Sequence, residues 1–506
     1  MNKISKHSFD PFSCGRFRLK FNNVLKCLIF TIVAFSVPLF LYGYLMLEYN
    51  YAIIGVNLVF IVSVLYSYLN IRRRVIYLVF NICMWVFLIS RPTISMIRGD
   101  VWWYFDDDCV KFALLSLYLT MLSMLVGGAL CERILQDKGA YKGEHTRDFI
   151  IINKKQIDLD RSILIISGML CLVCFVCKMA IGLEKIAFMS GKEYYEYYVS
   201  YESSFPYAFG TIASMMPYAL CVFLASMPKK RYAYAYLIMY VASTLPNLLI
   251  GIRNDIVLAL IFSFLYFYVR DYFDGTKYWV GKFERMACVI MIPIALVFLG
   301  AYNYIRDSAE YQSNAFSLIT DLFYKQGVSF DVLCLGYAAI PILPNVVAKN
   351  YTFGAIIDYL RTNIVSRTLF DIEPFPSGNS EMRAIYGNEF AHSMSYVVRD
   401  DYLEGHGFGS SFILETYADF GFVGMIVFSV LIGMLTIYML HLMKKSRMWR
   451  IVILLVLTQF FFMPRSSATG CFTFLLYIQF WVPVVVIMIL AHLINKKNDI
   501  ISYSNK

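Results

Sequence analysis

Apolar runs of membrane-spanning length recur along this chain of 506 residues, separated by short polar or charged turns. Because about 20 apolar residues cross the hydrocarbon layer as a helix, each run is predicted to be one span. About twelve spans are expected on this length criterion. They are Cys27 to Leu47, Ala52 to Leu69, Val75 to Ser90, Phe112 to Leu130, Ile163 to Ile181, Phe209 to Ala225, Tyr232 to Ile250, Ile256 to Val269, Met286 to Tyr302, Phe422 to Leu442, Ile451 to Met463 and Phe472 to Leu493.

The composition excludes a soluble globular enzyme. Apolar residues make up 59% of the chain and charged residues 16%, so a soluble core of this composition would leave a large apolar surface in water. The pattern and the composition together predict an all-α polytopic integral membrane protein. No small-residue cleavage pattern follows the first apolar run, which is therefore expected to be a retained span.

Basic residues orient the predicted spans. Of the 45 lysines and arginines, 29 lie on the two tails and on the even-numbered connections. The positive-inside rule then places both termini in the cytoplasm. The longest connection, Asn303 to Ser411, falls on the outer side, and it holds seven Lys/Arg against twelve Asp/Glu in a chain of net charge +10. Three parts are expected: a membrane bundle over 1–302, an outer loop over 303–411 and a second membrane bundle over 412–506.

Part of this loop is apolar. The segment Phe330 to Ala348 is nearly apolar enough to span, but Pro341 and Pro344 break a helix. An interfacial or re-entrant segment is expected there. The segment Phe353 to Val365 has the periodicity of an amphipathic helix.

Two hairpins carry a lone arginine at the outer membrane boundary. "GIRNDIV" holds Arg253, Asn254 and Asp255, and "MPRSSATG" holds Arg465. An ionisable group is costly at this depth and is a candidate functional residue. The planar guanidinium matches phosphate oxygens with two parallel hydrogen bonds. An ion pair from Arg253 to Asp255 that merely closes a tight turn is the alternative.

Acid and base groups collect near the same face. His392 lies in "GNEFAHSMSYVV" and His406 in "GHGFGSS", while Glu415 and Asp419 follow at the polar start of the next span. These residues are the available general acids and bases. Surface histidines without a role are the alternative, because titratability alone is weak support.

No metal ion and no cofactor is expected. The aspartates Asp106 to Asp108 are adjacent, and neighbours on one chain rarely converge on a cation. Cys171, Cys174 and Cys177 have zinc-like spacing but lack a fourth ligand inside a membrane helix. "GHGFGSS" lacks the Lys-Ser/Thr ending of a nucleotide-binding P-loop. The tyrosine-rich stretch Gly191 to Gly210 suits either a glycan or an interfacial aromatic belt.

The long late outer loop, the "GIRNDIV" and "MPRSSATG" hairpins and the pattern "GHGFGSSFILETYADFGFVG" resemble the bacterial O-antigen/capsule repeat-unit polymerases of the Wzy type. The resemblance covers the whole chain in architecture, whereas its specific motifs are short. It implies a fold similar to the lipid-linked-sugar glycosyltransferases of the O-antigen polymerase/ligase type. It also implies a multi-pass protein of the bacterial inner membrane whose large loop is periplasmic.

The implied activity is the polymerisation of undecaprenyl-pyrophosphate-linked oligosaccharide repeat units into O-antigen or capsular polysaccharide. Under this reading, the pyrophosphate is bound by Arg253 and Arg465, and the acceptor proton is taken by His392 or Glu415. The supporting residues are Asn254, Asp255, His406 and Asp419. The partners are the lipid-linked oligosaccharide, the bilayer and a chain-length regulator; no nucleic acid is expected.

Three other classes remain open from the residues alone. A lipid-linked oligosaccharide flippase or other transporter would show related halves and charges near the midplane, and no such repeat is seen. An O-antigen ligase would share the architecture and the arginines but use another acceptor. A structural membrane scaffold is the third alternative.

Overall fold

The computed structural model describes residues 11–139, 154–189, 201–274, 279–306, 314–376 and 378–504, and every regular element in these ranges is helical. Within them, 11 helices or kinked helical runs are long and apolar enough to cross a membrane. The prediction of an all-α polytopic membrane protein is confirmed. The elements before the large loop are α1 (Pro11–Leu45), α2 (Tyr49–Leu69), α3 (Ile71–Met84), the π-helix η1 (Trp85–Ile89), α4 (Ser90–Arg98), α5 (Asp107–Asp137), α6 (Lys154–Met189), α8 (Tyr207–Ser214), α9 (Met216–Ala225), α10 (Lys230–Ala242), α11 (Leu245–Leu249), α12 (Asn254–Asp274) and α13 (Lys282–Arg306).

One of the twelve predicted spans is not among these 11 runs. The run Tyr232 to Ile250 is divided into α10 and α11, with Ser243 and Thr244 between them. Pro246 lies in the first turn of α11, and a proline ring cannot donate the backbone hydrogen bond that would continue α10. Eleven candidate spans are therefore found where twelve were predicted, and the twelfth is an interrupted helix.

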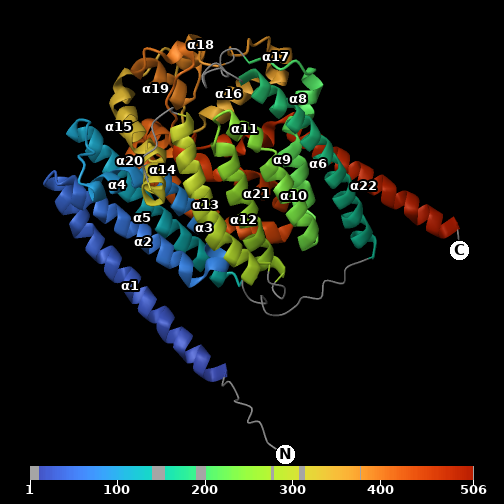
Figure 1. Cartoon of the computed structure of the whole chain (residues 1–506), viewed down its shortest axis with the longest axis horizontal. Helices are drawn as coiled ribbons and strands as arrows, with labels where there is room; N and C mark the ends of the chain where they lie inside the picture. Colours follow the sequence, from blue (N-terminus) through green and yellow to red (C-terminus); the bar gives the residue numbers. More distant parts are fainter. Residues whose placement is uncertain are drawn as a thin grey trace, which may run out of the picture.

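Much of the large loop forms short helices at one end of the bundle. Figure 1 shows α16 to α19 together at this end, far from the start of α1. The helix α13 continues to Arg306, beyond the predicted start of the loop at Asn303, and residues 307–313 lie outside the described ranges. The elements from here to the C-terminal end are α14 (Ala315–Gln326), α15 (Ser329–Ala339), η2 (Ile340–Ile342), α16 (Gly354–Thr362), α17 (Ile364–Phe370), α18 (Glu381–Tyr386), α19 (Phe390–Val398), η3 (Tyr402–Glu404), α20 (Phe412–Lys445), α21 (Arg447–Leu457), η4 (Phe460–Arg465), η5 (Gly470–Leu476) and α22 (Ile478–Ser504).

The apolar segment of the loop packs into the bundle. α15 contacts α5, α19 and α20, and the helix ends at the short 3-10 turn η2, which contains Pro341. The ring of Tyr337 on α15 stacks on Phe112 of α5, with centroids 4.3 Å apart. The predicted amphipathic helix is instead two helices, α16 and α17, which are divided at Asn363.

The helices α5 and α20 pack closely against each other in the membrane bundle. A Cβ atom on Gly127 would lie 2.1 Å from the carbonyl oxygen of Val430, and one on Gly433 would lie 2.2 Å from that of Met124. Membrane helices associate closely where small residues let the two backbones approach. These glycines therefore fix the distance between α5 and α20.

A backbone break at Gly421 divides α20. Gly421 has φ +63° and ψ −164°, a conformation that residues with a side chain rarely adopt. The first part of α20 carries Glu415 and Asp419, and the second part is the apolar membrane span. The break separates the polar candidates from the lipid-facing helix.

Candidate functional site

Two sequence motifs that are far apart in the chain lie side by side. The Oε2 atom of Glu415 accepts a hydrogen bond from the backbone N–H of Ala468 at 2.7 Å. In the preceding loop, a Cβ on Gly409 would lie 3.1 Å from the carbonyl oxygen of Arg465. The "GHGFGSS" segment and the "MPRSSATG" segment thus form one structural unit at the start of α20.

Arg465 faces the large loop. It ends η4 and is half-buried, and its Nη1 atom donates to the side-chain Oε1 of Gln326 at 3.2 Å and to the Gln326 carbonyl at 3.4 Å. The next residue of the loop, Gly327, lies against α4, where its Cβ would be 2.5 Å from the backbone nitrogen of Arg91. Arg91 in turn pairs with Asp331 at 3.2 Å. Two arginines therefore border the α14–α15 turn.

The carboxylates of Glu415 and Asp419 both bind backbone groups. Glu415 is buried, with 1% of its surface exposed. Asp419 accepts the N–H groups of Tyr351 and Thr352 at 3.0 and 2.6 Å, and the carbonyl of Thr352 accepts the hydroxyl of Thr469 at 2.9 Å. These bonds join the loop, α20 and the arginine hairpin. Both carboxylates are thus occupied by backbone N–H groups.

His392 lies in a polar network on α19. Its Nδ1 atom is 2.9 Å from the hydroxyl of Tyr402, and its Nε2 atom is 3.2 Å from Oε2 of Glu389. Arg383 approaches the same carboxylate at 3.5 Å. Burial acts to raise the pKa of Glu389, but the hydrogen bond from His392 and the charge of Arg383 outweigh burial and hold the pKa below its usual value. His392 thus has an acidic partner that orients its ring, as a general base requires.

The helix that carries His392 also holds the glycine-rich segment. On α19 the hydroxyl of Ser395 accepts the N–H of Phe408 at 2.8 Å. His406 lies 3.7 Å from Asp401, whose carboxylate also binds the guanidinium of Arg399 at 2.7 and 2.5 Å. These contacts connect α19, through residues 406 to 409, to the Arg465 hairpin.

The other predicted hairpin lies between α11 and α12. Arg253 is half-buried there, and Asn254 is the first residue of α12 and is exposed. The carboxylate of Asp255 accepts a hydrogen bond from the side-chain amide of Asn247 at 2.6 Å. α3 packs against both α12, which Arg253 precedes, and η4, which Arg465 ends.

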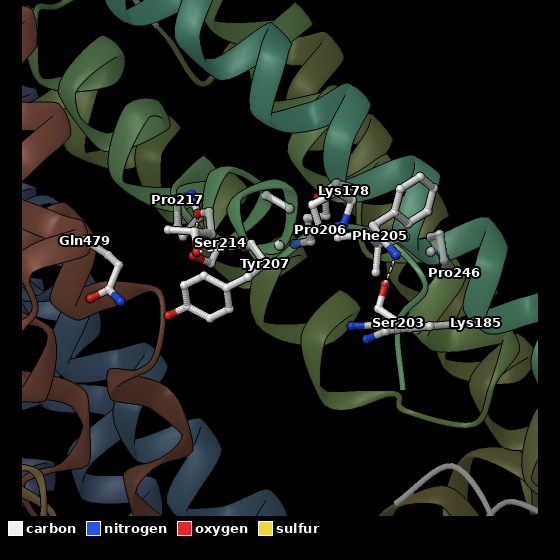
Figure 2. A pocket seen from close by; sticks show the side chains of 17 residues that line it. Lys178, Lys185, Ser203, Phe205, Pro206, Tyr207, Ser214, Pro217, Pro246 and Gln479 are labelled. Carbon is white, nitrogen blue, oxygen red and sulfur yellow. Dashed lines mark hydrogen bonds between the residues drawn. The ribbon is translucent and has the colours of Figure 1, made fainter. Parts of the chain in front are cut away.

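A cavity of about 770 Å³ lies beside the Arg253 hairpin, between α6, α8, α11 and the start of α22. Figure 2 shows Gln479 on one side of the cavity and Lys178 and Lys185 on the other, with Tyr207 between them. Sequence reasoning missed Lys178. The available signal was a lysine placed directly after "CLVCFVC", inside an apolar run. Residues 190–200, which include the first half of the tyrosine-rich stretch, lie outside the described ranges.

No group of three or more His, Cys, Asp or Glu side chains suited to a metal ion occurs within the residues that the structure describes. Asp107 accepts the hydroxyl of Tyr49 at 2.6 Å, and Asp107 and Asp108 lie in the first turn of α5, where negative charge is favourable. Cys171 and Cys174 are buried in the apolar core. Packing, the hydrogen bond from Tyr49 and the favourable charge at the start of α5 explain these side chains.

Comparison with known families gives one match. A family model described as "O-antigen polysaccharide polymerase Wzy" matches residues 28–498. No curated protein and no solved structure matches the chain at a significant level. The matched range includes every candidate residue described above and nearly the whole membrane bundle. The chain therefore belongs to the family of Wzy O-antigen polysaccharide polymerases.

Proposed function

We propose that this protein polymerises undecaprenyl-pyrophosphate-linked repeat units at the periplasmic face of the bacterial inner membrane. Membership of the Wzy family establishes repeat-unit polymerisation by glycosyl transfer in general terms. The donor, the side of the membrane and the residues that act are our proposal. In it, residues 1–302 and 412–506 form the membrane bundle, 303–411 form the periplasmic loop, and both termini are cytoplasmic.

The observation that carries the proposal is the junction between the Arg465 hairpin and the glycine-rich segment. It brings a guanidinium, the polar start of α20 and the loop helix α19 into one connected unit through Gly409, Glu415 and Ser395. A glycosyl transfer from a lipid diphosphate needs a cation for the leaving group and a base for the acceptor. The unit contains residues of both kinds.

In the proposed reaction, a sugar hydroxyl of a new repeat unit attacks the anomeric carbon of the growing glycan. The new C–O bond forms as the bond to the diphosphate breaks, and undecaprenyl pyrophosphate leaves with the bonding electrons. His392 accepts the hydroxyl proton, with Glu389 orienting the ring at 3.2 Å. Arg465 and Arg253 offset the negative charge that develops on the diphosphate.

The buried state of Glu415 favours His392 as the base. The carboxylate of Glu415 is engaged with the N–H of Ala468, whereas the side chain of His392 is 19% exposed. Glu415, Asp419 and His406 are proposed to position the loop, and Asn254 and Asp255 to position the Arg253 hairpin. No step calls for a metal ion or cofactor. A chain-length regulator is a proposed partner.

A gene-deletion strain tests the proposal through its glycan banding. Loss of a polymerase leaves lipid A core that carries one repeat unit. Loss of a ligase leaves none attached, and loss of a flippase stalls the units on the cytoplasmic side. Complementation by this chain should restore the full ladder. A C-terminal reporter that is active in the periplasm would overturn the proposed orientation.

A further inference from the structure

We propose that the cavity between α6, α8, α11 and α22 binds the diphosphate of a prenyl-linked substrate through Lys178 and Lys185. The inference rests on the proposed function, since it names a binding site for the lipid diphosphate of that reaction. It adds two lysines to the arginines considered so far. The cavity lies next to the Arg253 hairpin, because Asn247 lines the cavity and binds Asp255.

Lys178 is the central residue of this site. It lies on α6 within the span Asp158–Met189, where a charged side chain is costly and marks a functional position by default. In the described part of the chain, Lys178 makes no hydrogen bond or ion pair, and its Nζ atom lies 6.0 Å from the ring centroid of Tyr240. The carboxylate of Asp255, beside this cavity, already accepts the amide of Asn247. An anion in the cavity would complete the coordination of the ammonium group.

Lys185 adds a second ammonium group on the same face of α6. Residues seven apart lie two helical turns from each other, about 10.5 Å along the axis, and both line the cavity. The neighbouring carboxylate, Glu184, accepts hydrogen bonds from Tyr201, Ser203 and the backbone of Ser204 at 2.9, 2.7 and 2.6 Å. Glu184 therefore holds the rim segment in place. Two flexible ammonium groups suit a ligand that carries two phosphates.

The rim of the cavity has groups that suit the phosphates and the sugar of such a ligand. α8 begins here with Pro206 as its N-cap, which supplies no side-chain cap, so its first N–H groups favour an anion. Tyr207 is 86% exposed, and an exposed aromatic ring can stack on a sugar face. Ser203 and Ser214 also line the cavity. Its volume of about 770 Å³ is in the range of small-molecule sites.

A binding experiment on the purified full-length chain in phosphatidylcholine nanodiscs tests the site. The probe is undecaprenyl pyrophosphate, and undecaprenol, which lacks phosphate, is the comparator. Lys178→Met and Lys185→Met should each weaken diphosphate binding about tenfold or more, the usual effect of removing one charged hydrogen-bond donor. Binding of undecaprenol should not change. Lys26→Met, at an exposed lysine of α1, is the matched control and should bind like the wild type.

A second variant keeps both lysines and blocks the cavity. Gly210 lines the cavity, and a Cβ there would meet no atom within 4 Å. Gly210→Phe should therefore fold normally, which a melting curve checks, and should abolish diphosphate binding. If Lys178→Met does not fold, the Gly210→Phe variant still tests whether the diphosphate binds in this cavity.

The outcomes of these binding experiments distinguish a wrong donor from a wrong binding site. If wild-type protein does not bind undecaprenyl pyrophosphate, both the proposed donor and this site fail. If the wild type binds but Lys178→Met and Gly210→Phe bind within about twofold of it, a change too small for a lost charged contact, only the cavity assignment fails. If phosphatidylglycerol competes as well as the diphosphate, the cavity binds bulk lipid headgroups and the assignment is wrong.

Discussion

The carboxylate of Glu415 receives the backbone N–H of Ala468, three residues after Arg465, at 2.7 Å. An amide oxygen can accept the same bond, so Glu415→Gln should keep the hairpin in place and retain polymerisation. Glu415→Ala leaves a buried N–H without a partner and should cost about 1–3 kcal/mol of stability. Glycan ladders and melting temperatures measure the two effects.

The same pair of variants separates positioning from catalysis. If Glu415 were the general base, the glutamine variant would fold normally and make no polymer. That result would identify Glu415, and not His392, as the general base.

Arg465→Ala and Arg253→Ala should each abolish long glycan ladders while the protein still inserts. A contact to charge that develops in the transition state is worth about 3–4 kcal/mol, which is roughly 10²- to 10³-fold in rate. Lysine should rescue only in part, since it keeps the charge and loses the paired hydrogen bonds. Arg98→Ala, which removes the part-exposed ion pair with Asp321, is the control and should leave the ladder intact. Normal ladders from both arginine variants would place the diphosphate elsewhere.

His392→Gln should reduce polymerisation by about 10²- to 10⁴-fold, the usual contribution of a general base. The amide can still hydrogen-bond with Tyr402 but cannot accept a proton at neutral pH. His492→Gln, at an exposed position of α22, is the matched control. Activity within a few-fold of the wild type in His392→Gln would contradict the assignment.

The depressed pKa of Glu389 predicts an acid-sensitive loop. His392 and Arg383 favour the ionised carboxylate in the folded state, so the folded pKa lies below the unfolded one. This stabilisation is fully present above the unfolded pKa of about 4.3, and it is lost as the pH falls through the folded value. Melting curves recorded from pH 6 down to pH 3.5 should show a smaller acid-induced loss in Glu389→Gln. Identical pH profiles of the wild type and Glu389→Gln would show that ionisation of Glu389 does not stabilise the folded protein.

Gly127→Leu should prevent the close approach of α5 and α20 and lower the amount of folded protein. The substituted side chain would overlap the backbone of Val430. Ala129→Leu, on the exposed face of α5, is the matched control and should accumulate normally. Size-exclusion profiles of the solubilised proteins provide the measurement.

Local patterns predicted most of the fold, since length and hydropathy determine a membrane span. They missed the break between α10 and α11, although the sequence Thr244-Leu245-Pro246 contained the signal. The burial of Glu415 was not predictable, because it depends on Ala468, a residue 53 positions away. Lys178 could have been found from its place in an apolar run, but its cavity is built from helices that are far apart in the sequence.

The close approach of α5 and α20 at Gly127 and Gly433 also constrains how the protein is made. The ribosome must add about 300 residues after α5 before α20 exists, which takes roughly 15 to 60 s at 5–20 residues per second. During that interval α5 sits in the bilayer with its glycine surface covered by lipid or by an insertion factor. The N-terminal helices therefore reach their final arrangement only near the end of translation, and truncated chains that lack α20 are expected to be degraded.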